Sequence, residues 1–190
     1  MKMSLPSTNV IIRAMSVLIV IAVLLTAVPA VYAESSGPLT PIPGLGRLPN
    51  ETLVLMHKNE GTWFNNLQSL FVEANTLSGT FQTLIDEGVK NGKDVLALKD
   101  ALATFDSEVI ASREIHTLAG TTIFSLVGWK ATGDVRDRLA AGASLLDGRA
   151  TLRDAHFRLS DAIVILRKSF VIWRAGIIRN PGTNPAAAGG

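Results

Sequence analysis

Apolar residues recur at alternating intervals of three and four positions over most of the chain between residues 50 and 179. This spacing places them on one side of an α-helix, at the period of helices that pack side by side. Glycine-containing segments at 88–92 and 127–133 interrupt the pattern twice. The pattern therefore predicts three long helices: 50–87, Asp94 to about residue 123, and Asp134 or Asp137 to residue 179.

The predicted buried side of each helix is a defined series of residues. In the first helix it consists of Leu53, Met56, Trp63, Leu67, Leu70, Ala74, Leu77, Phe81 and Leu84, interrupted by Glu60. In the second it consists of Val95, Leu98, Leu102, Phe105, Val109, Ser112, His116, Ala119 and Ile123. In the third it consists of Leu145, Arg149, Leu152, His156, Leu159, Ile163, Leu166, Phe170, Trp173 and Ile177.

Helices of this length joined by short connections must fold back on one another. We therefore predict an all-α fold, an antiparallel three-helix bundle of long, coiled-coil-like helices over residues 50–179. Positions of the first two helices whose numbers sum to about 180 should face each other. For the second and third helices the sum should be about 262, which places Asp94 opposite Lys168.

Local signals mark where the helices begin and where one of them could break. Asn50 and Asp94 are residue types favoured at the N-cap, because their side-chain oxygens accept hydrogen bonds from the first turn. Gly142 and Gly148 weaken the start of the third helix. A break near Asp147 therefore remains an alternative to one continuous third helix.

Residues 1–33 have the features of a secretory signal peptide. Lys2 and Arg13 precede an apolar run from Ala14 to Val28, and small residues stand at the end of Val31-Tyr32-Ala33. This order of charged, apolar and small residues is typical of a cleaved signal. We expect a secreted or extracytoplasmic protein, in the periplasm or at the cell surface, with an uncleaved N-terminal membrane anchor as the alternative.

Two further segments lack helical periodicity. Residues 34–49 contain four prolines and three glycines, which predicts an extended linker. Residues 180–190 (NPGTNPAAAGG) predict a disordered tail.

Charge and cysteine content narrow the classes of function. Two of the 18 basic residues lie in 1–33, which leaves 16 against 16 acidic residues, so the exported part is formally neutral. A neutral chain argues against nucleic acid as a partner. Without any cysteine, the exported part has no disulfide and must be held by packing alone. Acidic residues dominate residues 50–124, whereas basic residues dominate residues 134–179.

Several motifs of the helical region occur together in one known type of protein. They are the NGKD turn (91–94), the run Ala101–Phe105, and TLRDAHFRLSDA (151–162), followed by a Leu-Arg pair and Trp173. The chain resembles exported bacterial three-helix proteins that carry an LRDAH…LR…W pattern in the last helix. The resemblance spans about residues 50–174 and implies the fold and export, without implying an activity. The chain departs from the pattern near the C-terminus, where Ile, Val or Phe occupies expected polar positions.

Candidate chemistry is sparse. His57 and Glu60 share one side of the first helix, and the predicted register places His116 level with Glu60. Facing helices of bundles can hold a metal ion with such side chains, but the four-helix carboxylate sites use two Glu-x-x-His motifs. A Glu60–His116 hydrogen bond without a metal explains the same residues and is our preferred interpretation. We find no catalytic set and no cofactor motif, and expect a protein that is not an enzyme.

The end of the third helix is more apolar than one buried side requires. We predict a partner surface from Val164, Phe170, Val171, Ile172, Trp173, Ile177 and Ile178. Tight packing inside the bundle is the alternative interpretation. Binding of this helix to an anionic membrane surface, through the basic residues Arg167, Lys168, Arg174 and Arg179, is another.

These observations favour an exported, non-enzymatic helical bundle that acts through protein–protein contact or self-association, as a scaffold or chaperone-like binder. The alternatives are an extracytoplasmic metal-binding bundle, with His57, Glu60 and His116 as ligands, and a protein associated with a membrane surface.

Overall fold

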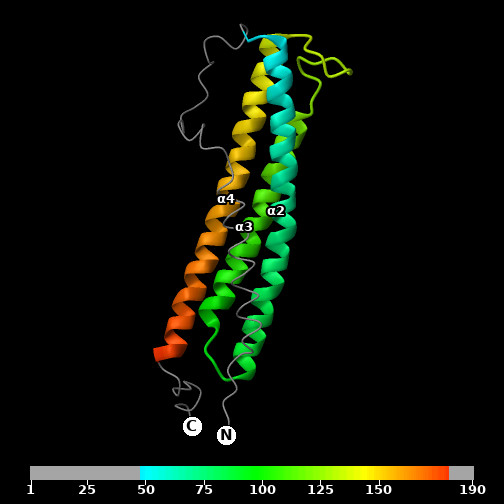
Figure 1. Cartoon of the computed structure of the whole chain (residues 1–190). Helices are drawn as coiled ribbons and strands as arrows, with labels where there is room; N and C mark the ends of the chain where they lie inside the picture. The colour runs from blue at the N-terminus through cyan, green and yellow to red at the C-terminus, as the bar shows by residue number, and fades with distance from the viewer. Residues whose placement is uncertain (1–47, 180–190) are drawn as a thin grey trace. The chain divides into compact units, whose positions relative to one another are not determined.

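The computed structural model describes residues 48–179, with side chains for residues 48–176. This part of the chain forms three helices and no strand: α2 (Asn50–Lys90), α3 (Leu96–Ile123) and α4 (Arg138–Arg179) (Figure 1). The all-helical prediction is confirmed. The predicted signal peptide (1–33), nearly all of the predicted linker (34–49) and the predicted tail (180–190) lie outside the described residues.

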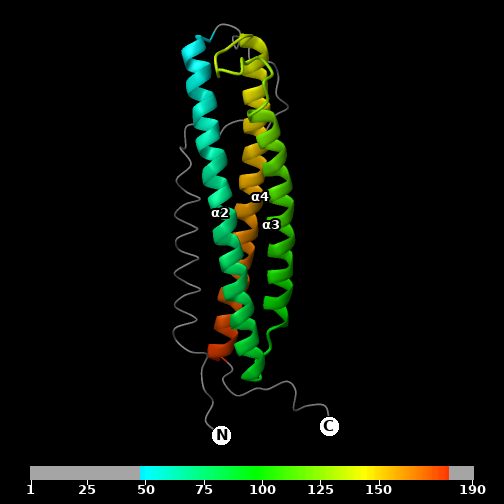
Figure 2. The same ribbon diagram turned by 90° about the vertical axis from the view of Figure 1, so that its right-hand side faces the viewer.

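The chain divides into two compact units. Unit 1 contains Leu70–Ile110 and the α4 residues from Arg158 onward. Unit 2 contains α2 up to Ser69, together with Ala111–Phe157. Segments of the same three helices lie side by side in each unit (Figures 1 and 2).

The contacts of unit 2 set the direction and register of its helices. His57 on α2 contacts Ile123 on α3, and Phe64 contacts His116, so α2 and α3 are antiparallel. Both pairs of residue numbers sum to 180, as predicted. Ser112 on α3 contacts Ala155 on α4, so these two helices are also antiparallel, but their numbers sum to 267 instead of 262.

The long connection between α3 and α4 accounts for this displaced register. It does not form a symmetrical turn: Trp129 pairs with Val135, and the amides of Arg136 and Asp137 both donate to the carbonyl of Gly128. Gly128 has φ of +80°, a conformation that favours glycine. A Cβ there would collide with the backbone of Ala141. The connection is therefore folded against the first turn of α4, which shifts that helix along α3.

The starts of α3 and α4 are capped by aspartates. Asp94 Oδ1 accepts a hydrogen bond from the Leu96 amide at 3.0 Å, so the cap predicted at Asp94 is confirmed. Asp137 Oδ1 accepts from the amides of Leu139 and Ala140 at 2.9 and 3.1 Å. Of the two starts proposed for the third helix, Asp137 is therefore the one used.

The structure departs from the cap predicted at Asn50 and excludes the alternative of a break near Asp147. The side-chain oxygen of Asn50 accepts a hydrogen bond from Arg138 Nε at 2.8 Å instead of capping α2. No break occurs near Asp147, because α4 is continuous from Arg138 to Arg179. A Cβ added to Gly148 would lie 2.5 Å from Ile123 Cγ1, so this glycine permits close approach to α3 instead of ending the helix.

The predicted buried sides of the helices are confirmed in both units. All nine residues of the α3 series are buried, and in α2 only Met56 and Trp63 are partly exposed. In α4, Arg149 and Trp173 are partly exposed, and the side chain of Ile177 lies outside the described residues. The core of unit 1 contains the aromatic pair Phe81 and Phe170, whose ring centroids lie 5.7 Å apart.

Candidate functional site

Unit 2 differs from an ordinary apolar core because four polar residues are buried in it: Glu60, Ser112, His116 and His156. The first lies on α2, the next two on α3 and the last on α4. Buried polar groups are stable only when they are hydrogen-bonded or paired. Their partners therefore decide whether these residues form a binding site or serve the fold.

Glu60 forms an ion pair with Arg149. Its Oε1 lies 3.5 Å from Arg149 Nη1, and the residue is only 4% exposed. Burial raises the pKa of the Glu60 carboxyl, and the Arg149 guanidinium opposes this shift. Glu60 Oε2 is buried and has no hydrogen-bond partner among the described residues. The pair joins α2 to α4 and replaces the predicted Glu60–His116 hydrogen bond, which is wrong.

His116 is held by Phe64 of the facing helix. Its ring stacks on the Phe64 ring with centroids 3.9 Å apart and an interplanar angle of 17°. Its Nε2 also donates to the Phe64 carbonyl oxygen at 3.0 Å. Burial lowers the pKa of the His116 imidazole, and this hydrogen bond opposes the shift. The neutral form of the ring is therefore favoured in the folded protein.

His57 closes the end of α3. Its Nε2 donates to the carbonyl oxygen of Ile123, the last residue of that helix, at 3.0 Å. The final carbonyls of a helix have no partner within the helix, so a side-chain donor satisfies one of them. Trp129 stacks on the imidazole ring of His57, with the ring centroids 4.6 Å apart. This geometry gives His57 a structural role.

The three residues considered as metal ligands are therefore not directed at one point. His57 bonds to Ile123, Glu60 pairs with Arg149, and His116 bonds to Phe64. Within residues 48–176, no three side chains of the kinds that bind metals are grouped so that they could hold an ion. The geometry thus offers nothing in favour of the metal-binding hypothesis.

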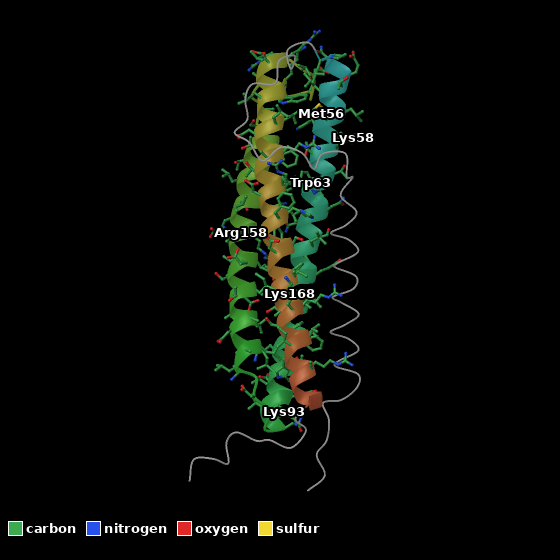
Figure 3. All side chains as sticks on the ribbon, turned by 90° about the vertical axis from the view of Figure 1, so that its left-hand side faces the viewer. Met56, Lys58, Trp63, Lys93, Arg158 and Lys168 are labelled. Carbon is green, nitrogen blue, oxygen red and sulfur yellow. The ribbon has the colours of Figure 1, made fainter. Side chains whose placement is uncertain are left out.

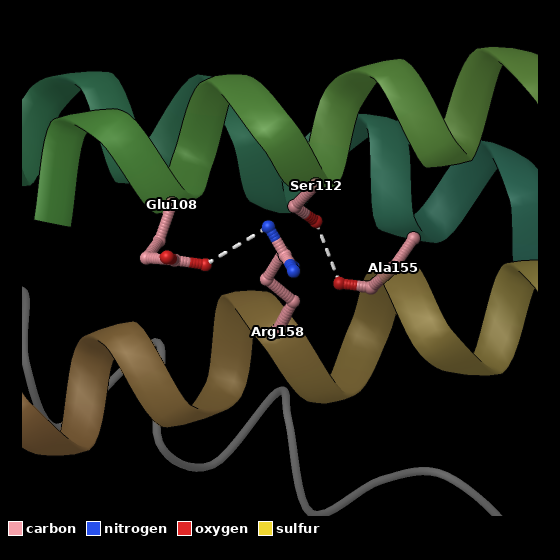
Figure 4. Close-up of polar contacts among 4 residues, drawn as sticks. All are labelled: Glu108, Ser112, Ala155 and Arg158. Atoms are coloured by element: carbon pink, nitrogen blue, oxygen red, sulfur yellow. Dashed lines mark hydrogen bonds and ion pairs between the residues drawn. The ribbon is translucent and has the colours of Figure 1, made fainter.

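Figure 4 shows two of the polar contacts that join α3 to α4, one in each unit. In unit 2 the buried hydroxyl of Ser112 donates to the Ala155 carbonyl at 2.6 Å. In unit 1 Arg158 Nη1 lies 3.4 Å from Glu108 Oε2, with both side chains more than a third exposed. The first contact fixes a buried register, whereas the second is a solvent-screened pair of small energetic weight.

The outer side of α4 in unit 1 is the most distinctive surface. Val164, Ile165, Val171 and Ile172 are all exposed, Ile172 to 72%. They form two rows of identical residues spaced by seven positions, and exposed Lys168 lies between the rows. Figure 3 shows this side of the ribbon with Lys168 labelled on α4. We call these five residues the α4 face.

Two residues of the predicted partner surface lie elsewhere, and the side chains of two others are not described. Phe170 is in the core of unit 1 at 3% exposure. Trp173 is partly buried, and its Nε1 donates to the Asp94 carbonyl at 2.7 Å. Ile177 and Ile178 belong to α4, but their side chains lie outside the described residues. Of the predicted surface, Val164, Val171 and Ile172 are thus exposed.

Sequence reasoning missed the role of Trp129. It was assigned to a connection without pattern, yet it is buried with Leu53, Ala141 and Leu145. A tryptophan between two glycines of the connection was the available signal, because large aromatic side chains are rarely left in solvent.

Comparison of the chain with protein-family models, with curated proteins and with solved structures found no match. The resemblance to exported three-helix proteins therefore rests on the motif residues alone. Among the described helices, none combines the length and apolar character needed to cross a bilayer.

Proposed function

We propose that this protein is an exported, non-enzymatic helical bundle that acts by protein–protein contact, and that the α4 face is its contact surface. The observation that carries the proposal is the regular pair of apolar rows on the outside of unit 1. Apolar residues repeated every seven positions on one side of a helix are the arrangement against which another helix packs.

The shape of the apolar side chains on the α4 face supports the proposal of a contact surface. Val164, Ile165, Val171 and Ile172 are β-branched, so their side chains lose little conformational entropy when another surface covers them. Scattered exposed apolar residues are common and need no explanation, but a contiguous group of them marks an interaction surface. Unit 1 already has a closed apolar core, so the α4 face is not required for its folding.

A membrane surface is the second candidate, because basic residues accompany the apolar rows. Arg167 and Lys168 are both exposed, and no acidic residue follows Asp161. Interfacial helices, however, usually place aromatic side chains at the lipid boundary, and Trp173 is engaged with Asp94 instead. Flotation with anionic vesicles in low and high salt tests this candidate: salt-sensitive flotation would favour it over a protein partner.

The absence of cysteine from the whole sequence permits a direct test. Single variants Ile172→Cys and Val72→Cys would each be labelled with a photoreactive benzophenone maleimide and illuminated in an extract of the cells that produce the protein. Val72 is the matched control, because it is 62% exposed on α2 of the same unit but outside the α4 face. We expect protein adducts at position 172 and none at 72. No adduct at 172, with its own chain or another protein, contradicts the proposal.

A further inference from the structure

The α4 face has a property beyond its apolar rows: its central charge has no ion-pair partner among the described residues. Lys168 lies between the row of Val164 and Val171 and the row of Ile165 and Ile172. Within the described residues it makes no ion pair. A partner that covers both rows must also cover this ammonium group. Because a buried unpaired charge is strongly unfavourable, the partner must supply an acidic group at that point.

A surface with these complementary features is present on α3 of unit 1. Leu96, Ala103 and Ile110 are exposed at intervals of seven, with Leu96 at 65% and Ile110 at 61%. Exposed Asp100 stands between the first two. Its carboxylate likewise makes no ion pair within the part of the chain that the structure describes. We call Leu96, Asp100, Ala103 and Ile110 the α3 face.

The two faces are complementary in charge. Ala103 is small and lies between two large apolar residues, so a neighbouring helix can approach α3 closely at that point. A single acid stands within the apolar row of the α3 face, and a single base stands between the apolar rows of the α4 face. Opposite charges placed together in this way set the register of two packed helices.

Contact between two α4 faces is a poorer arrangement. A symmetric dimer of that kind would bring the Lys168 groups of both copies, and the neighbouring Arg167 groups, to the same interface. Like charges facing each other across an interface disfavour association by several kcal/mol. The charges therefore favour α4 against α3 over α4 against α4.

We propose that the protein associates with a second copy of itself, the α4 face of one copy packing on the α3 face of the next, with Lys168 paired to Asp100. This inference rests on the proposed function and names the partner. A contact between two different faces is heterologous, so each bound copy keeps one face open and assembly continues unless a ring closes. A standard interface uses roughly 20–30 residues a side, and these faces contribute only a few each, so we expect a weak and reversible contact.

Sedimentation equilibrium of the full protein, purified as its producing cells process it, tests the proposal from about 10 µM to about 1 mM, the range of weak contacts. We expect a weight-average mass that rises continuously, or that stops at a ring larger than a dimer. Lys168→Glu and Asp100→Lys should each weaken association at least about tenfold, because each creates a like-charge contact. The double variant Lys168→Glu/Asp100→Lys should restore it.

A mixture of the two single variants provides a second readout. Each variant repels its own kind, but the two together form attractive contacts at both faces, so an equimolar mixture should associate. Lys90→Glu and Asp86→Lys reverse exposed charges of unit 1 outside both faces and serve as matched controls. Circular dichroism melting curves of all variants should coincide with the wild type, because exposed substitutions of this kind change stability little.

The possible outcomes separate this inference from the proposed function. A monomer at all concentrations, a mass that stops at a dimer, or a double variant that does not recover would overturn the pairing of α4 with α3. Stronger association of Lys168→Gln, which removes the like-charge contact between two α4 faces, would indicate α4 against α4 and would also overturn it. If photo-crosslinking at position 172 then captures only a different protein, the proposed contact function stands without self-association.

Discussion

Unit 1 and unit 2 are built from segments of the same three helices, yet different kinds of contact stabilise the interior of each unit. The interior of unit 1 is apolar, with Phe81 against Phe170, and the ion pair between Arg158 and Glu108 lies at the surface. Unit 2 contains all three histidines of the chain and a buried glutamate. The same helical period can therefore support two kinds of core. One stabilises the fold through burial of apolar side chains, and the other sets the register of the helices through polar contacts.

Both units leave large apolar side chains exposed, among them Leu118, Phe124 and Phe157 in unit 2. In unit 1 they include the α4 face and the α3 face, where apolar residues repeat at intervals of seven. In unit 2 the capping contacts of His57 and the stacking of Trp129 close the end of α3. A core that is apolar throughout can tolerate changes on its outer sides, so unit 1 is the better place for an interaction surface.

The largest effect should come from the apolar core. Phe81→Ala should lower the free energy of unfolding by about 3–5 kcal/mol, because it removes buried area and leaves a cavity. Urea denaturation followed by circular dichroism measures this change. Val72→Ala, on an exposed side of the same helix, should change it by less than about 0.5 kcal/mol. A small effect of Phe81→Ala would contradict the picture of unit 1 as the apolar support.

The closely packed glycine of unit 2 should give the next largest effect. Gly148→Ala places a Cβ 2.5 Å from Ile123 Cγ1, so we expect a loss of about 1–3 kcal/mol from overpacking. Gly79→Ala is the matched control in unit 1, because nothing lies within 4 Å of its Cβ position. It should gain about 0.5–1 kcal/mol from reduced chain entropy. If both variants gain stability, α4 does not approach α3 as described.

The buried glutamate should make the stability of unit 2 fall as the pH rises above 4.5. The pKa of Glu60 in the folded protein is raised above 4.5, so its contribution to folding stability is fully present below 4.5 and is lost as the pH rises through the folded pKa. Glu60→Gln does not titrate, so between pH 4.5 and pH 7.5 this variant should lose less stability than the wild type. Glu51→Gln, exposed on the same helix, should show no such dependence, and urea denaturation at both pH values is the measurement.

The smallest effect should come from His116. Its contribution to folding stability changes with pH in the opposite direction from that of Glu60. Its folded pKa lies below 6.5, so the unfolded chain takes up the proton first and stability is lost as the pH falls below 6.5. His116→Gln keeps a donor for the Phe64 carbonyl but does not titrate. The loss of stability between pH 7 and pH 5.5 should therefore be smaller in this variant than in the wild type, measured by thermal melting. An unchanged slope would contradict this role of His116.

Much of the fold was predictable from particular residues. The spacing of the α2 and α3 series gave the buried sides, and the NGKD turn gave the register in which His57 faces Ile123. The α3–α4 register was not predictable, because it depends on how Trp129 and Gly128 fold the connection against α4. The partners of Glu60 and His116 were not predictable either. The sequence placed these two residues at one level of the bundle. Their contacts with Arg149 and Phe64 depend on how the three helices pack.

The sequence by itself determined that this is a cysteine-free chain of three long helices, because helical periodicity is a local property of the order of residues. It also determined that the last helix carries more apolar residues than one buried side can use. Only the tertiary structure decided that Phe170 and Trp173 pack inward while Val171 and Ile172 face outward. That division depends on which side of α4 the other two helices cover, and this is fixed by contacts between residues far apart in the chain.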